Sequence, residues 1–158
     1  MRRYFNTEGT CRPHIHYMVR IDDRLEQIKR RYVDRGKYFL INRGRQYGKT
    51  TTLKALAEYL QTEYQVISMD FQGISTKEYA DEFTFVKAFM RMFEEDGAAN
   101  DVIMPTDVFA DTTRQTTLGE MFYLLSEICK TASKPIVLMI DEVDSASNNQ
   151  VFIDFLAQ

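Results

Sequence analysis

Long apolar runs are absent from this sequence of 158 residues, and none approaches the length of a membrane-spanning helix, which requires about 20 apolar residues. The first residues, Met1–Asn6, carry charge, but no apolar segment follows them as it would in a secretory signal peptide. Cysteine is also scarce, because Cys11 and Cys129 are the only two and show no disulfide framework. We therefore expect a cytoplasmic protein with reduced thiols and no membrane association.

Candidate metal ligands are few near the N-terminus. Cys11, His14 and His16 lie within six residues, but no fourth ligand that would complete a tetrahedral zinc site follows them. Residues 1–20 also show no clear periodicity. We expect residues 1–20 to form an N-terminal arm on a core formed by residues 21–158. With 44% hydrophobic residues, the chain can bury one sizeable core.

Charge is unevenly distributed along the chain. Up to Lys54 there are 14 lysines and arginines against 5 acidic residues, a net charge of +9; from Ala55 onward there are 6 against 18, a net charge of −12. Such asymmetry can mark a nucleic-acid surface. It also arises when one half holds a phosphate site and the other holds metal-binding acids. We favour this second interpretation, because a positive field attracts an anionic nucleotide equally well.

The sequence is organised around the stretch Lys37–Thr52. It begins with the apolar run Tyr38–Ile41, which predicts a buried β-strand, and continues through a loop that ends in Gly48-Lys49-Thr50. A helical pattern follows, with apolar residues on one face of a 3.6-residue period: Leu53, Leu56, Ala57 and Leu60. A strand, a loop and a helix in this order are the context in which a G-K-T sequence indicates a phosphate-binding loop.

The residue types of this loop suit a nucleotide triphosphate. The first turn of a helix presents N–H groups at the positive end of its dipole, and Gly48 lets the backbone approach a phosphate closely. Lys49 would contact the β- and γ-phosphates, and Thr50 would bind Mg²⁺. The predicted ATP-binding residues are Gly44, Arg45, Gln46, Tyr47, Gly48, Lys49, Thr50 and Thr51. The loop departs from the usual G-x-x-x-x-G-K-[ST] pattern, because Arg43 occupies the position of the first glycine.

Apolar periodicity and capping residues predict the remaining elements. Asp22 or Asp23 is expected to cap a helix that ends at Gly36. Capping boxes at Ser75 and at Thr117, each with a glutamate three residues later, predict two further helix starts. The predicted elements are helices at 22–35, from 75 to about 96, from 117 and at 151–157, strands at 66–70 and 136–140, and an irregular connection at 97–113.

A second motif follows the strand at 136–140. Its continuous apolar character indicates burial on both faces of a parallel sheet, and ligands bind at the carboxyl ends of such strands. Asp141 would bind Mg²⁺ together with Thr50, and Glu142 would activate the attacking water as a general base. The predicted catalytic residues are therefore Glu142 and Lys49, and the predicted metal ligands are Thr50 and Asp141.

The two motifs together resemble those of the AAA-like P-loop ATPases. The sequence R-G-R-Q-Y-G-K-T at Arg43–Thr50 looks like the R-x-R-R-[FY]-G-K-[ST] loop of bacterial AAA-ATPase-like proteins, in which arginine commonly replaces the first glycine. The D-E-V-D of Asp141–Asp144 is similar to the D-E-[IVF]-D of that group. The resemblance covers residues 21–144. It implies ATP and Mg²⁺ as cofactors and an α/β, three-layer P-loop fold with helices on both faces of the sheet.

The sheet order that this resemblance implies is 5-1-4-3-2. The segments 38–41, 66–70 and 136–140 would be strands 1, 2 and 3, so that the last two would be neighbours. The sequence ends within the helix that should lead to strand 4, so we expect an incomplete N-terminal part of the core. Its isolated chain should hydrolyse ATP weakly or not at all, and Phe152, Phe155 and Leu156 should form an exposed apolar patch.

Three functional interpretations remain open at this point. The first is ATP binding, and hydrolysis in an intact assembly, coupled to a conformational change on an unknown partner. The second is a nucleotide-binding switch, or a remnant, that does not hydrolyse ATP. The third is a DNA-directed or helicase-like motor. The expected partner is the nucleotide, a homo-oligomer and a nucleic acid are possible further partners, and no membrane is expected.

Overall fold

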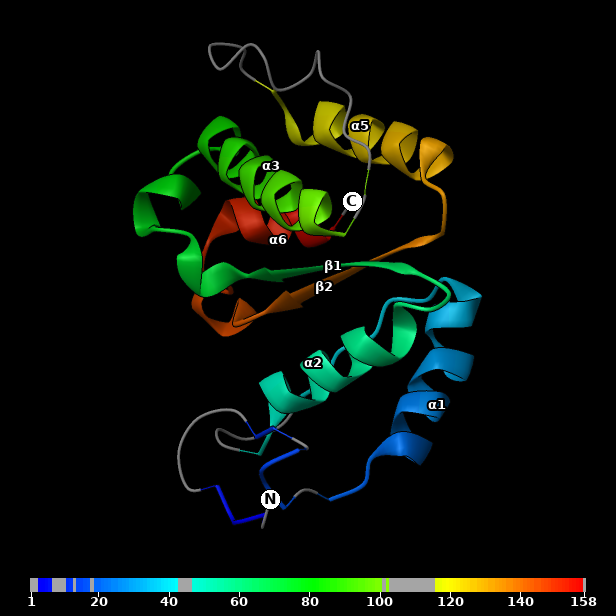
Figure 1. Cartoon of the computed structure of the whole chain (residues 1–158). Helices are drawn as coiled ribbons and strands as arrows, with labels where there is room; N and C mark the ends of the chain where they lie inside the picture. The colour runs from blue at the N-terminus through cyan, green and yellow to red at the C-terminus, as the bar shows by residue number, and fades with distance from the viewer. Residues whose placement is uncertain are drawn as a thin grey trace. The chain divides into compact units, whose positions relative to one another are not determined.

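The computed structural model describes residues 3–6, 11–12, 14–17, 19–42, 47–100, 102 and 116–157. The chain divides into two compact units, Met1–Thr62 and Glu63–Gln158, which follow one another along the colour gradient of Figure 1. The predicted division into an arm at residues 1–20 and a core at 21–158 stays a prediction. Among the described residues, no helix is long and apolar enough to cross a membrane.

Where the structure describes the first unit, the chain forms the α-helices α1 (Asp22–Arg31) and α2 (Lys49–Leu60) and the short 3₁₀ helix η1 (Val33–Arg35). Helix α1 follows Ile21, so the prediction that Asp22 or Asp23 is the cap is wrong. Both aspartates lie in the first turn of α1, where the positive end of the helix dipole stabilises negatively charged side chains.

Helix α1 also ends earlier than predicted. Tyr32, with φ −123°, interrupts the α-helix, and the last residues before Gly36 form η1. Gly36 has φ 58°, a left-handed conformation that glycine adopts without strain, and it ends the segment as predicted.

The segment Tyr38–Ile41 is not a strand, contrary to the sequence prediction. None of its residues pairs with a neighbouring strand, Tyr38 is fully exposed, and Leu40 is 75% exposed. Apolar character alone is not sufficient, because a strand needs a partner to satisfy its N–H and C=O groups. The described residues of Met1–Thr62 supply no neighbouring strand.

The second unit contains a two-stranded parallel sheet formed by β1 (Gln65–Asp70) and β2 (Ile136–Asp141). The register runs from Gln65 opposite Ile136 to Asp70 opposite Asp141. The expected adjacency of these two segments is therefore confirmed. The expectation that the strand at 136–140 is buried throughout is wrong, because Met139 is its only buried residue and the others are half-buried.

The described residues of the second unit also form three α-helices and three short 3₁₀ helices: α3 (Glu82–Ala99), α5 (Leu118–Thr131), α6 (Gln150–Leu156), η2 (Phe71–Gly73), η3 (Thr76–Tyr79) and η4 (Val143–Ser145). Helices α3, α5 and α6 lie on the same side of the β1–β2 sheet (Figure 1). The described fold is thus mixed α/β with a small parallel sheet. Helices on both faces of a larger sheet, as in a three-layer arrangement, are not seen among the residues of this unit that the structure describes.

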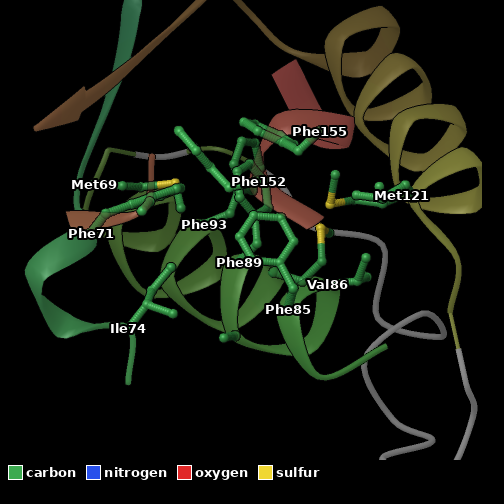
Figure 2. Close-up of a cluster of buried hydrophobic side chains, with 14 of the residues drawn as sticks. Met69, Phe71, Ile74, Phe85, Val86, Phe89, Phe93, Met121, Phe152 and Phe155 are labelled. Atoms are coloured by element: carbon green, nitrogen blue, oxygen red, sulfur yellow. The ribbon is translucent and has the colours of Figure 1, made fainter. Parts of the chain in front are cut away.

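An aromatic core joins the helices of the second unit to β1. Phe71, Phe85 and Phe89 have no exposed surface, and their rings pack at centroid distances of 6.3–6.4 Å (Figure 2). Phe152 and Phe155 of α6 are also buried, at 3% and 8% exposure. The prediction that these two rings lack cover is therefore wrong, since α3 and the segment after β1 supply it. Leu156 is exposed, as expected.

Both predicted capping boxes are present, but the first caps a different helix. Ser75 and Glu78 cap the short helix η3, whereas α3 begins only at Glu82. The interruption occurs because Asp81 is extended and accepts a hydrogen bond from the Thr84 N–H at 2.9 Å, which makes it a second N-cap. Of the predicted irregular connection at 97–113, the first three residues belong to α3, and nearly all the others lie outside the described residues.

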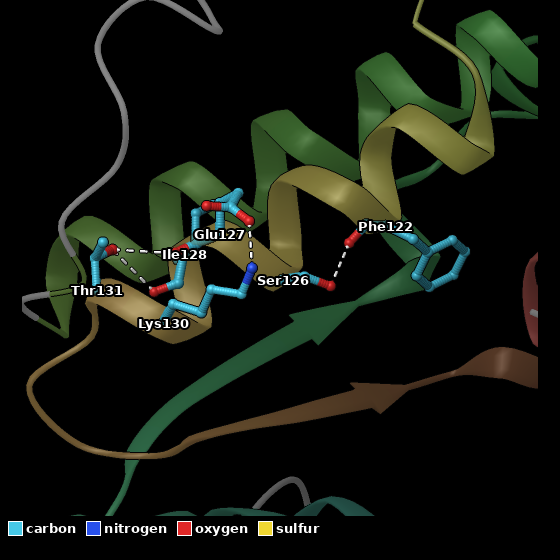
Figure 3. Close-up of polar contacts among 6 residues, drawn as sticks. All are labelled: Phe122, Ser126, Glu127, Ile128, Lys130 and Thr131. Atoms are coloured by element: carbon cyan, nitrogen blue, oxygen red, sulfur yellow. Dashed lines mark hydrogen bonds and ion pairs between the residues drawn. The ribbon is translucent and has the colours of Figure 1, made fainter.

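Helix α5 begins as predicted. The Thr117 hydroxyl and the Glu120 carboxylate cap each other's backbone N–H groups at distances of 3.2 and 2.9 Å. Near the other end, Lys130 pairs with Glu127 at 2.6 Å, and Thr131 donates to the carbonyl of Ile128 (Figure 3). The buried side chains of α5 are Leu118, Met121 and Ile128, whose spacing of three and seven residues places them on one face of the helix.

Candidate functional site

The start of α2 carries the predicted phosphate-binding residues. Gly48 precedes the helix with φ 73°, a left-handed conformation that is strained for residues with a Cβ. A Cβ added there would have its nearest contact at 3.9 Å, so the backbone conformation, and not lack of space, requires glycine. This sharp turn directs the chain into α2 at Lys49.

A buried threonine, not singled out from the sequence, fixes this turn. The Thr52 side chain is 4% exposed, and its Oγ1 donates to the Gly48 carbonyl at 2.8 Å. The Thr52 N–H donates to the same carbonyl at 2.9 Å. Two bonds to one oxygen hold Gly48 against the first turn of α2. The signal in the sequence was the third threonine of the run Thr50–Thr52.

The predicted phosphate-binding residues are only partly described. Lys49, Thr50 and Thr51 form the first turn of α2, where N–H groups and the helix dipole favour an anion. Tyr47, just before Gly48, is 73% exposed. The other predicted ligands, Gly44, Arg45 and Gln46, lie outside the described residues. The structure thus brings Lys49, Thr50 and Thr51 together at one helix end.

The second candidate group lies at the carboxyl end of β2. Asp141 is the last residue of the strand, and its Oδ1 accepts a hydrogen bond from the Glu142 N–H at 2.9 Å. Glu142 has φ 57° and is the only non-glycine residue with positive φ in the described part of the chain. This conformation is uncommon for glutamate and concentrates at functional sites. The backbone therefore turns sharply where the predicted general base lies.

A further carboxylate, not predicted from the sequence, lies beside this group. Asp70 ends β1 and is the register partner of Asp141 in β2. Its Oδ1 accepts a hydrogen bond from the Gln72 N–H at 2.9 Å, which makes Asp70 the cap of η2. The signal was present in the sequence, since the apolar strand at 66–69 also ends in aspartate. The carboxyl end of the sheet thus carries Asp70, Asp141 and Glu142.

The two groups differ in their chemistry. The start of α2 offers a cation, hydroxyls and N–H groups, which suit phosphate oxygens. The end of the sheet offers carboxylates, which suit a hard cation or the removal of a proton from water. Within the described residues, no group of three or more histidine, cysteine or acidic side chains is arranged to hold a metal ion by itself. The two groups belong to different compact units.

Comparison with protein-family models gives one finding that spans both groups. The model described as an AAA-like domain matches residues 8–157. This chain belongs to the AAA-like domain family. Comparisons with curated proteins and with solved structures returned no match.

Membership of this family gives the function at a coarse level. An AAA-like domain is a nucleotide-binding, ATPase-like protein, and nucleotide binding in such domains generally involves Mg²⁺. The family match includes both the start of α2 and the end of β2. The residues of both candidate groups therefore lie within the part of the chain that matches the AAA-like domain.

Proposed function

We propose that this AAA-like domain binds ATP with Mg²⁺ and hydrolyses ATP when it is part of an intact assembly. The observation that carries the proposal is the left-handed turn at Gly48, which leads directly into a helix whose first turn is Lys49, Thr50 and Thr51. Helix N-termini of this kind bind phosphate through N–H groups and the dipole. Lys49 adds a positive charge for the β- and γ-phosphates, and the loop residues Gly44–Tyr47 complete the proposed ATP site.

The donor set fits Mg²⁺. Magnesium prefers oxygen ligands and is commonly held by one or two protein groups together with phosphate oxygens and water. Thr50 offers a hydroxyl and Asp141 a carboxylate, and these are the residues that would hold the ion. Bound Mg²⁺ would neutralise phosphate charge during the transfer.

Glu142 is the proposed general base. Its left-handed backbone conformation, together with the hydrogen bond from its N–H to Asp141, supports this role, because strained residues concentrate at catalytic sites. A carboxylate that accepts a proton from the attacking water would leave hydroxide directed at the γ-phosphate.

The test of this role is Glu142→Gln, which preserves the shape of the side chain and removes the base. We expect ATP to remain bound while hydrolysis falls by roughly 10²–10⁴-fold. Glu94→Gln, at an exposed position of α3, is the matched control and should leave the rate unchanged. A wild-type rate in Glu142→Gln would exclude Glu142 as the base.

Two alternatives make different predictions in the same assay. A switch or remnant that only binds nucleotide would show no Glu142-dependent hydrolysis in any assembly. A DNA-directed motor would show hydrolysis that DNA stimulates, and the positive charge of the first 54 residues is the feature in its favour. We favour an ATPase that needs no nucleic acid, because attraction of the anionic nucleotide is sufficient to explain the positive charge of this segment. Self-association and a cytoplasmic location complete the proposal.

A further inference from the structure

The peptide group between Gly48 and Lys49 lies where the left-handed turn passes into α2. Its carbonyl oxygen accepts two hydrogen bonds from Thr52, one from the N–H at 2.9 Å and one from Oγ1 at 2.8 Å. The first is the ordinary bond with which the residue before a helix begins the intrahelical series. The second is additional, and it comes from a side chain that is only 4% exposed.

These two bonds also set the direction of the Lys49 N–H. The described part of the chain contains no cis peptide bond, and the C=O and N–H of a planar trans peptide group point in opposite directions. Because the Gly48 carbonyl points along α2 toward Thr52, the Lys49 N–H points outward from the start of the helix. An anion approaches a helix start from this side. Thr52 therefore controls the direction of an N–H in the proposed phosphate site.

Gly48 by itself would hold this orientation poorly. Helix ends fray, and glycine has more accessible backbone conformations than any other residue. Most N-cap residues hold the first turn with a side-chain oxygen, whereas glycine has no side chain, and Gly48 makes no such bond. The Thr52 hydroxyl holds the Gly48 carbonyl instead, from inside the helix.

The burial of Thr52 makes any other orientation of the turn unfavourable. The Gly48 carbonyl is the one acceptor that the Thr52 hydroxyl has among the described residues. If this carbonyl turned away from α2, the hydroxyl would lose its acceptor in a place that little water reaches. A buried hydroxyl without a hydrogen bond destabilises the conformation that contains it.

We propose that Thr52 is a positioning residue of the phosphate site, whose hydroxyl holds the turn at Gly48 in its binding conformation before a nucleotide arrives. The inference rests on the proposed ATP site at the start of α2. Thr52 does not contact the phosphate, because its hydroxyl is directed back to the Gly48 carbonyl. An ordered turn loses less conformational freedom on binding. If the turn were only partly ordered, the apparent dissociation constant would rise in proportion.

The first experiment measures the affinity of the full chain for ATP and for tripolyphosphate, each with Mg²⁺, by calorimetry. Thr52→Val keeps the shape of the side chain and removes the hydroxyl, and it should weaken both ligands by about three- to tenfold. Equal weakening is expected because tripolyphosphate has no base or ribose and reports on the phosphate site alone. Thr52→Ser keeps the hydroxyl and should bind both ligands within about twofold of the wild type.

A matched control removes the same kind of hydrogen bond elsewhere. The Thr131 hydroxyl donates to the Ile128 carbonyl of its own helix at 3.1 Å, so Thr131→Val should leave both affinities unchanged. Thr52→Val and Thr52→Ser each remove buried atoms, so a purely structural role predicts that both variants lose affinity. Equal losses in the two variants, or wild-type affinity in Thr52→Val, would overturn the proposal.

The second experiment needs no nucleotide. Hydrogen exchange of the residue 52 N–H, which donates to the Gly48 carbonyl, reports how often the turn opens. After correction for intrinsic rates, exchange should be about threefold or more faster in Thr52→Val than in the wild type and Thr52→Ser. An unchanged rate in Thr52→Val would contradict the positioning role. By contrast, wild-type ATP affinity in Lys49→Ala would contradict the phosphate site itself, so the two failures are distinguishable.

Discussion

The two compact units differ in how their aromatic residues are used. In Glu63–Gln158, the rings of Phe71, Phe85 and Phe89 are fully buried and contact one another. In Met1–Thr62, Tyr38 is fully exposed and Tyr47 is 73% exposed. Partners distant in sequence hold the second unit together, whereas the key feature of the first unit, the turn into α2, depends on neighbouring residues. The helix start that we propose as the phosphate site can thus form locally, whereas the sheet that carries Asp70 and Asp141 depends on a packed core.

The largest expected effect tests this difference in packing. Phe89→Ala should destabilise the second unit by about 3–5 kcal/mol, because it removes a fully buried ring and leaves a cavity beside Phe93 and Phe155. Tyr38→Ala, which removes an exposed ring, should change the free energy of unfolding by about 0.5 kcal/mol or less. Urea denaturation followed by circular dichroism measures both. Equal losses would show that Tyr38 is packed in solution.

A smaller effect is expected where the second unit contains local strain. Glu142→Gly should stabilise the fold by about 1 kcal/mol, because glycine adopts φ 57° without the steric cost that glutamate bears. Glu94→Gly, at an exposed position of α3, is the control and should destabilise by about 1 kcal/mol. Thermal unfolding of the two variants measures both changes in stability, which should have opposite signs. A loss of stability in Glu142→Gly would mean that the interactions of the Glu142 side chain stabilise the fold by more than its backbone strain costs.

The smallest expected effect concerns pH and the cap of η3. Hydrogen bonds from the backbone and hydroxyl of Ser75, with Arg91 nearby, hold the pKa of Glu78 below its ordinary value of 4.5. Its contribution to stability is therefore complete above pH 4.5 and is lost as the pH falls through the lower pKa of the folded state. Glu78→Gln should reduce the acid sensitivity of unfolding in this range. An unchanged pH profile in that variant would assign the sensitivity to other carboxylates.

The sequence predicts local features of this chain well. The capping box of α5, the left-handed Gly36 and the strand segments of β1 and β2 follow from residue types at short spacing. The interruption before α3 was missed because Ser75 and Asp81 both satisfy the rules for an N-cap, and only packing selects where the long helix starts.

Features that depend on distant partners were predicted less well. The apolar run Tyr38–Ile41 indicated a strand, but the described chain offers it no partner. Asp70 was missed at the candidate site although it ends an apolar strand in the sequence, because only the register of the sheet places it opposite Asp141. The helix start at Lys49 and Thr50, by contrast, was predicted correctly, because the preceding glycine and the apolar periodicity mark it locally.

Calorimetric titration of the chain with ATP and Mg²⁺ tests the central claim most directly. We predict saturable binding that Lys49→Ala weakens at least tenfold, or about 1.4 kcal/mol, because the main cation at the start of α2 is lost. Lys54→Ala, at an exposed position further along the same helix, should bind ATP as the wild type does. Equal affinity of the Lys49→Ala variant and the wild type would contradict the claim that the start of α2 is the phosphate site.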